Sequence, residues 1–224
     1  MLSKGNMKMS DNILHGDAAR AYVANSLGRE LTQKESRIIG LEGFAPTPYE
    51  DTKGIMTTGV GQTGKWMDKS FPESLAYHEE ETRRMVPKYD ELSEDLQTEL
   101  LQATYRGDLQ QSPTARRLLN EGKYAEASAE FLDHDEFRND KTPQQIKDRL
   151  TSVSMALAQE AGVEGTVNNG TYTAVAGDNP YTIAKRNGIS LEELASLNPE
   201  VGVALQQGQL GLGQQLNVKY TGLE

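Results

Sequence analysis

The sequence predicts an α+β fold, in which a mainly helical domain with a small β element precedes a smaller β-α-α-β domain. Three observations carry this prediction. Helix-start signals recur along residues 1–164, helix-breaking residues crowd residues 44–63, and the composition changes near residue 164. With 224 residues, the chain is long enough to form one large or two modest hydrophobic cores.

The first helices have clear boundaries in the sequence. Residues 17–27 have the spacing of a short amphipathic helix. Thr32 and Glu35 form a capping-box pattern, apolar residues follow, and Gly43 should end that helix. Further helices are expected after Ser70, where Pro87 should end the helix, and after Ser93, Ser112 and Thr142.

Residues 44–63 should contain turns and short strands. They carry five residues that break helices, namely Pro46, Pro48, Gly54, Gly59 and Gly61. No helix is expected to continue through that density of proline and glycine.

A domain boundary is expected near residue 164. The first 164 residues carry a net charge of −8, while the last 60 carry −2 and nine of the 21 glycines. We therefore predict an N-terminal extension at 1–30, a first domain at 31–161, a linker at 162–170 and a second domain at 171–220. The extension can be a packing segment, a docking segment or a disordered tail, and packing on the domain is favoured. The second domain should contain a strand from Tyr172, helices at 181–187 and 191–197, and a strand within 210–218.

Composition excludes several classes of function. A net charge of −10 argues against nucleic-acid binding and against adhesion to anionic membranes. Cysteine is absent, and His15, His78 and His134 lack ligand spacing, so neither a metal nor another cofactor is expected. No signal peptide or membrane-spanning run is found, so synthesis in a cytoplasm without membrane insertion is expected.

One stretch has the residues for acid/base chemistry. Glu42 should lie at the negative C-terminal end of a helix, a position that favours the protonated carboxyl group of a general acid. Asp51 should lie in a turn whose backbone N–H groups can hold it ionised, and Thr57 offers a hydroxyl that can position water. Two carboxyl groups in different environments suit glycosidic hydrolysis. Taken alone, however, any one of 33 acidic residues is more often a surface charge.

The same stretch resembles the active-site region of the phage-type lysozymes (muramidases), whose pattern is Glu-Gly, Tyr, Asp, Gly and Thr-x-Gly-x-Gly. The resemblance covers about residues 31–160 and implies a two-lobed, mainly helical fold with a small β lobe. It implies that Glu42 protonates the leaving oxygen, that Asp51 activates water and that Thr57 helps to hold this water. The substrate contacts implied are Tyr49, Gly59, Gly61, Gln62, Tyr105 and Arg149. Two departures are Gln62, where many members have His, and residues 104–108 on the cleft-lining helix.

The second domain resembles a LysM domain. The match begins at Tyr172 and continues through residues 187–199 to 212–218. It implies binding of N-acetylglucosamine-containing glycans through two loops. The residues implied are Gly177, Asp178, Asn179 and Pro180 in one loop, and Asn198, Pro199, Glu200 and Val201 in the other. A degenerate module that serves only in assembly is the alternative.

Together the resemblances imply a hydrolase that cleaves between N-acetylmuramic acid and N-acetylglucosamine in bacterial peptidoglycan. It would be a phage endolysin, released to the periplasm with the help of a holin, or a virion-associated lysozyme held by phage tail proteins. The alternative is a non-catalytic virion structural or wall-attachment protein with a lysozyme-like fold.

Overall fold

The computed structural model describes residues 13–51, 53–133, 135–139, 141–162, 167–168, 170–174, 178, 180–206, 210 and 214–218. The chain forms two compact units, residues 1–82 and 83–224, which divide inside helix α3 (Phe71–Met85). The prediction of a protein with mixed helix and sheet is confirmed.

The first unit begins with two packed helices, α1 (Gly16–Leu27) and α2 (Gln33–Glu42). Both directions of the expected capping box are present between Thr32 and Glu35, so α2 starts where the sequence indicates. Glu35 also accepts hydrogen bonds from both terminal nitrogens of Arg29, at 2.8 and 2.7 Å. Helix α1 packs on α2, and its described residues therefore extend the domain rather than form a separate tail.

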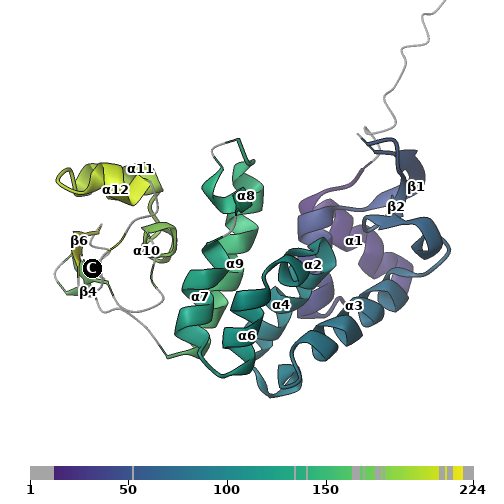
Figure 1. The fold of residues 1–224 in the computed structure, drawn as a ribbon. Helices are drawn as coiled ribbons and strands as arrows, with labels where there is room; N and C mark the ends of the chain where they lie inside the picture. Colours follow the sequence, from purple (N-terminus) through teal and green to yellow (C-terminus); the bar gives the residue numbers. More distant parts are fainter. Residues whose placement is uncertain are drawn as a thin grey trace, which may run out of the picture. The chain divides into compact units, whose positions relative to one another are not determined.

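A three-stranded antiparallel sheet follows, formed by β1 (Ala45–Glu50), β2 (Met56–Gly59) and β3 (Gln62–Thr63) in that order. The register between Ala45 and Tyr49 is irregular, in a segment whose two prolines lack the N–H groups that a regular ladder needs. The short 3-10 helix η2 (Gly64–Trp66) then leads to α3. The expected short strands are confirmed, and Figure 1 shows β1 and β2 beside α1.

The second unit opens with helices around one apolar core. Its elements are η3 (Tyr89–Glu91), α4 (Glu94–Arg106), α5 (Asp108–Gln111), α6 (Pro113–Asn120), α7 (Tyr124–Leu132), α8 (Asp135–Arg138) and α9 (Gln144–Glu160). Figure 1 shows α7 and α9 side by side. Leu100, Phe131 and Leu157 are fully or almost fully buried in this core. A buried hydroxyl pair also joins the two helices, with 2.9 Å between Ser128 Oγ and Ser154 Oγ.

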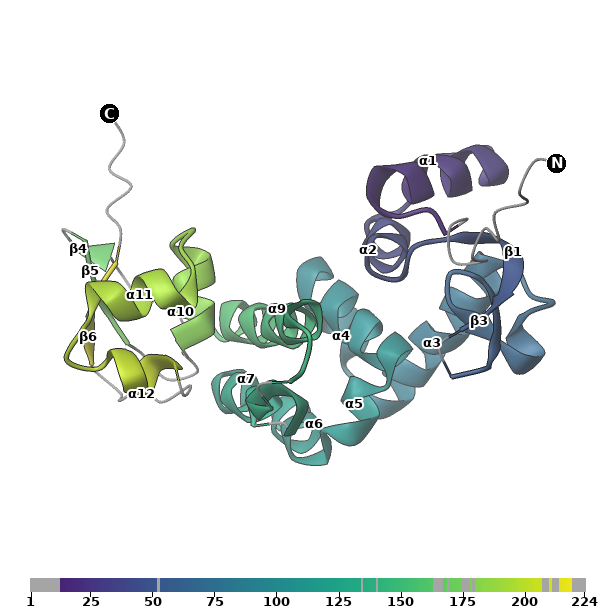
Figure 2. The same cartoon turned by 90° about the horizontal axis from the view of Figure 1, so that it is seen from above.

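The last part of this unit has its own apolar core, which includes Tyr172, Ile183, Leu194 and Leu216. Its strands β4 (Val167–Asn168), β5 (Thr171–Thr173) and β6 (Gln215–Asn217) pair in that order. Figure 2 shows its three helices gathered beside these strands. The helices are α10 (Pro180–Arg186), α11 (Leu191–Leu197) and α12 (Gly202–Gln206).

Three local predictions need correction. Strand β4 lies inside the expected linker at 162–170 and pairs with β5, so this stretch belongs partly to the second sheet. The predicted β-α-α-β pattern does not include helix α12, because this helix is short and the sequence carries no capping signal before it. The helix expected after Thr142 begins at Gln144, one residue later than a start directly after Thr142, because Pro143 is the N-cap of α9.

Two absences hold for the described ranges. No helix there is both long enough and apolar enough to span a bilayer. No group of three or more His, Asp or Glu side chains there is arranged to hold a metal ion.

Candidate functional site

Glu42 is the last residue of α2 and is half-buried, as the sequence predicts for its position. The chain turns from α2 toward β1 at Gly43, where φ is +76° and a Cβ atom would lie 2.7 Å from the carbonyl oxygen of Leu14. Gly61 lies on the other side of the carboxyl group. A Cβ atom on Gly61 would be 3.8 Å from Oε2 of Glu42. Glu42 therefore faces the turn that joins β2 to β3.

Asp51 follows directly after β1 and closes the turn toward β2. Its Oδ1 accepts hydrogen bonds from the backbone N–H groups of Lys53 and Ile55, both at 2.8 Å. Its own N–H donates to the carbonyl oxygen of Ile55 at 2.9 Å. These bonds fix the direction of the carboxylate, and the expected backbone N–H donors are present.

Tyr49 connects the two carboxylates electrostatically. Burial raises the pKa of the Tyr49 phenol, and the negative charges of Asp51 and Glu42 raise this pKa further. Both carboxylates thus act on a single hydroxyl group. Glu42 and Asp51 therefore both lie within electrostatic range of Tyr49.

Thr57 lies in the centre of the sheet, opposite Tyr49 on β1 and Thr63 on β3. It is buried, and its hydroxyl donates to the carbonyl oxygen of Ile55 at 3.1 Å. A hydroxyl that donates to the backbone keeps its oxygen as a hydrogen-bond acceptor. Thr57 can therefore accept a hydrogen bond from water, and it also steadies the turn held by Asp51.

Gln62 and Gly59 lie against each other and stabilise the segment that follows β3. The resemblance implies that both residues contact substrate. The Gln62 amide is buried and donates to the carbonyl oxygens of Trp66 at 3.1 Å and Lys69 at 2.7 Å. A Cβ atom on Gly59 would lie 2.2 Å from Oε1 of Gln62, so only glycine fits beside this amide. These contacts hold the segment after β3 against the sheet.

Two aromatic residues that were not predicted as part of the site, Trp66 and Tyr77, follow β3 in the chain. The rings of Trp66 and Tyr77 are 4.5 Å apart, and the ammonium of Lys65 lies over both. Tyr77 is exposed and Trp66 half-buried. Burial lowers the pKa of the neighbouring His78, while Glu81 opposes this shift. A tryptophan alone in the sequence gives no signal for such a group.

Arg149 on α9 and Tyr105 on α4 belong to the second unit, whereas the site residues described above belong to the first. Arg149 is 5% exposed, and its Nε donates to Oε1 of Gln102 at 3.0 Å. The Gln102 amide in turn donates to the carbonyl oxygen of Arg149. This pair joins α4 to α9, so Arg149 has a structural role, and its expected contact with substrate stays a prediction. Tyr105 is half-buried on α4.

Two polar residues expected to bind glycan, Asp178 and Asn198, also make hydrogen bonds within the last domain. The Asp178 side chain is fully buried and accepts hydrogen bonds from the Tyr172 hydroxyl at 2.6 Å and from Arg186 at 2.9 Å. Asn198 is buried and makes two hydrogen bonds with the backbone of Asn217, at 2.8 and 2.7 Å, which join the end of α11 to β6. Their side chains are therefore already occupied.

The remaining expected glycan contacts divide by exposure. Pro180 is buried, Pro199 and Glu200 are exposed, and Val201 is half-buried. Gly177 and Asn179 lie outside the described residues. Two apolar side chains that were not predicted as contacts, Leu197 and Val203, are exposed on either side of the second loop. Their exposure is visible only once the helices are placed.

Comparison with protein families identifies the last part of the chain. Residues 172–219 match the LysM domain, a peptidoglycan-binding module, and agree closely with the predicted 171–220. No curated protein has significant sequence similarity to the chain. The core that includes Tyr172 and Leu216, with the helices and strands around it, is thus a LysM domain.

Proposed function

We propose that this protein is a peptidoglycan hydrolase, in which the unit that carries Glu42 and Asp51 cleaves the glycan that the LysM domain binds. The substrate bond joins N-acetylmuramic acid to N-acetylglucosamine. LysM domains bind peptidoglycan, which supports the choice of polymer. The resemblance of residues 31–160 to phage-type lysozymes supports the choice of reaction and a lysozyme-like two-lobed fold.

The observation that carries the proposal is that Glu42, which faces the β2–β3 turn, and Asp51, at the end of β1, both act electrostatically on Tyr49. Glycosidases place two carboxyl groups on opposite sides of the bond that they cleave. Glu42 comes from a helix end and Asp51 from a hairpin turn, so their environments differ.

Each residue then has one role in the reaction. Glu42 donates its proton to the glycosidic oxygen as the bond from this oxygen to the anomeric carbon breaks. Asp51 takes a proton from the water whose oxygen forms the new bond to that carbon. Thr57 accepts a hydrogen bond from this water. Direct attack by water predicts inversion at the anomeric carbon.

The biological setting of the proposal has two forms. The protein is made in the cytoplasm of an infected host, and it either reaches the wall through a holin-dependent lesion or travels in the virion on tail proteins. Detection of the protein in purified virions by mass spectrometry separates the second form from the first.

A second candidate function is a non-catalytic wall-attachment protein. The observation that favours it is the role of Asp51 as a turn residue, since both hydrogen bonds to its Oδ1 come from its own loop. Such an arrangement is also found in ordinary Asx turns. In that case the LysM domain alone would provide the interaction with the wall.

A pair of substitutions at Asp51 distinguishes the candidates. Asp51→Asn keeps an oxygen that can accept both backbone hydrogen bonds but removes the base, whereas Asp51→Ala removes both properties. For a hydrolase, both variants should lose release of reducing sugar from peptidoglycan by about 100-fold or more, in line with the ~10²–10⁴-fold effect of a general base. Equal activity of Asp51→Asn and wild type, or no activity in wild type, would favour the attachment protein.

A further inference from the structure

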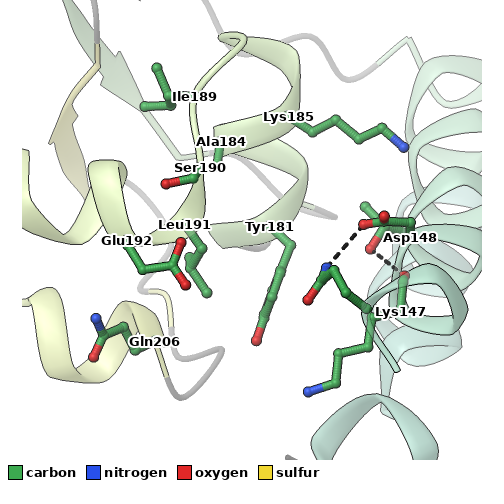
Figure 3. Close-up of a pocket in the computed structure, with 12 residues that line it drawn as sticks. Lys147, Asp148, Tyr181, Ala184, Lys185, Ile189, Ser190, Leu191, Glu192 and Gln206 are labelled. Atoms are coloured by element: carbon green, nitrogen blue, oxygen red, sulfur yellow. Dashed lines mark hydrogen bonds between the residues drawn. The ribbon is translucent and has the colours of Figure 1, made fainter. Parts of the chain in front are cut away.

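A polar groove in the second unit lies between α9 and the LysM helices. Its volume is about 760 Å³, within the range of pockets that hold small organic ligands. Gln144, Lys147, Asp148 and Thr151 line it from α9. The opposite side is lined by LysM residues, namely Tyr181, Ala184, Lys185, Ile189, Ser190, Leu191, Glu192 and Gln206. Figure 3 shows the Tyr181 side chain projecting from α10 into the space between α9 on one side and Glu192 and Gln206 on the other.

The groove is formed by contacts between these elements. The ring of Tyr181 packs edge-on against Phe137, with 4.8 Å between ring centroids. Tyr181 also packs against the apolar core of the helical part. The Lys185 ammonium donates to Oγ of Ser152 on α9 at 3.2 Å.

Lys147 is the unusual side chain in this groove. The residue is only 8% exposed, yet within the described part of the chain its ammonium makes neither a hydrogen bond nor an ion pair. An ammonium that lines a groove without an ion-pair partner is available to form a charge-assisted hydrogen bond with an anionic ligand. The neighbouring Asp148 instead accepts a hydrogen bond from the amide of Gln144 at 3.0 Å.

We propose that this groove binds the stem peptide of peptidoglycan, and that Lys147 binds a carboxylate of that peptide. The proposal rests on peptidoglycan binding by the LysM domain, and it does not require the hydrolase activity. Lys185, on the opposite side of the groove, provides a second cation. Asp148 and Glu192 provide carboxylates for the free amine that a stem peptide carries on its diamino acid. The groove thus matches a ligand that carries both charges.

This site would change what the second unit recognises. The LysM domain would bind the glycan, while the groove beside it would bind the peptide attached to that glycan. Two linked weak contacts on one polymer give a higher combined affinity than either contact alone. Wall material without peptide stems would then bind less tightly than complete peptidoglycan.

Calorimetric titration of the full-length protein tests the site. The probes are a synthetic stem tetrapeptide with free carboxylates and the same peptide with these groups amidated. Wild type should bind the free tetrapeptide, and amidation should weaken binding at least fivefold. Lys147→Met keeps the apolar stem of the side chain but removes the charge, and it should weaken binding to the same extent. Lys88→Met is the matched control, because Lys88 is an exposed lysine outside the groove, and it should bind as wild type does.

Three further measurements distinguish a peptide site from a general anion site and from a loss of folding. N-acetylglucosamine oligomers without peptide should bind Lys147→Met and wild type equally, which checks the LysM domain. If circular dichroism shows that Lys147→Met is unfolded, Lys185→Met is used instead, because Lys185 is exposed. The proposal is overturned if wild type does not bind the tetrapeptide or if Lys147→Met binds it unchanged. Complete competition by millimolar inorganic phosphate would also overturn it, because the groove would then be a general anion site.

Discussion

Gly61 faces the carboxyl group of Glu42: a Cβ atom on Gly61 would lie 3.8 Å from Oε2. This distance is ordinary van der Waals contact, so a methyl group there would cover one side of the carboxyl group without overlapping it. The backbone of Gly61 has a φ of +70°, which disfavours other residues as well. Two separate constraints therefore apply to this position, and only one of them concerns Glu42.

Gly61→Ala should reduce glycan hydrolysis about tenfold, equivalent to about 1.4 kcal/mol in the barrier, because the methyl group occupies space that the leaving oxygen needs. Gly64→Ala is the matched control. Gly64 also has a positive φ, of +52°, but nothing lies within 4 Å of its Cβ position. Both variants should lose similar stability from backbone strain, and thermal melts should show this. Similar loss of activity in both would mean that the Gly61 effect is only structural.

The pKa of Tyr49 should report the two carboxylates. Burial is the largest cause of its raised pKa and should persist, whereas the charges of Asp51 and Glu42 can be removed. Glu42→Gln and Asp51→Asn should each lower the Tyr49 pKa toward its ordinary value of about 10. NMR titration of ring-labelled tyrosine measures this, with Glu50→Gln at an exposed position of β1 as the control. An unchanged Tyr49 pKa in both variants would show that neither carboxylate acts on the Tyr49 hydroxyl.

The LysM domain should lose stability in alkali. Burial and the hydrogen bond to Asp178 raise the pKa of Tyr172 far above its ordinary value. The folded state therefore keeps the phenol proton after the unfolded chain has lost it. The stabilisation is complete below about pH 10, the ordinary tyrosine pKa, and is lost as the pH rises above that value.

Hydrogen exchange of LysM amide protons, measured from about pH 8 to beyond the ordinary tyrosine pKa of about 10, follows this loss. Tyr172→Phe should be less stable by about 1–3 kcal/mol at neutral pH, because a buried acceptor loses its donor. Its stability should also depend less on pH in alkali. Tyr124→Phe, in the other core of the same unit, should leave LysM exchange unchanged. Parallel pH profiles for wild type and Tyr172→Phe would contradict the assignment.

Wall binding should increase with salt over a moderate range. The chain carries a net charge of −10, and bacterial walls are largely anionic, so the two repel each other at low ionic strength. Salt at about 0.1 M shortens the Debye length to about 10 Å and screens this repulsion. Sedimentation with insoluble peptidoglycan measures the bound fraction. Binding that falls steadily as salt is added would show that electrostatic attraction dominates instead.

Local signals in the sequence predict most elements of the fold. The Thr32–Glu35 capping box and Gly43 both act within one helical turn, so they place α2, and with it Glu42, correctly. The short strands after Gly43 follow from proline and glycine content alone. In contrast, α12 and β4 are too short to leave a pattern, and they form because the LysM core and sheet hold them.

The roles of individual polar residues are harder to predict. Gln62, Arg149 and Asn198 all occupy expected site positions, yet their side chains make hydrogen bonds that join separate elements. Lys147 was not predicted as a site residue, because the sequence around it indicates an ordinary exposed helix surface. The groove that it lines is closed by helices more than 30 positions further along the chain. Contacts between segments that are far apart in the chain decide such roles, and local sequence patterns do not indicate these contacts.

The most direct test of the proposed hydrolase is the release of new reducing ends from purified peptidoglycan. Wild type should release N-acetylmuramic acid reducing ends. Glu42→Gln should reduce this release at least about 100-fold, because the amide cannot donate the proton that the leaving oxygen needs. Glu30→Gln, at an exposed acidic residue of the same unit, should behave as wild type does. No reducing ends from wild type, or equal release by Glu42→Gln, would contradict the proposed hydrolase.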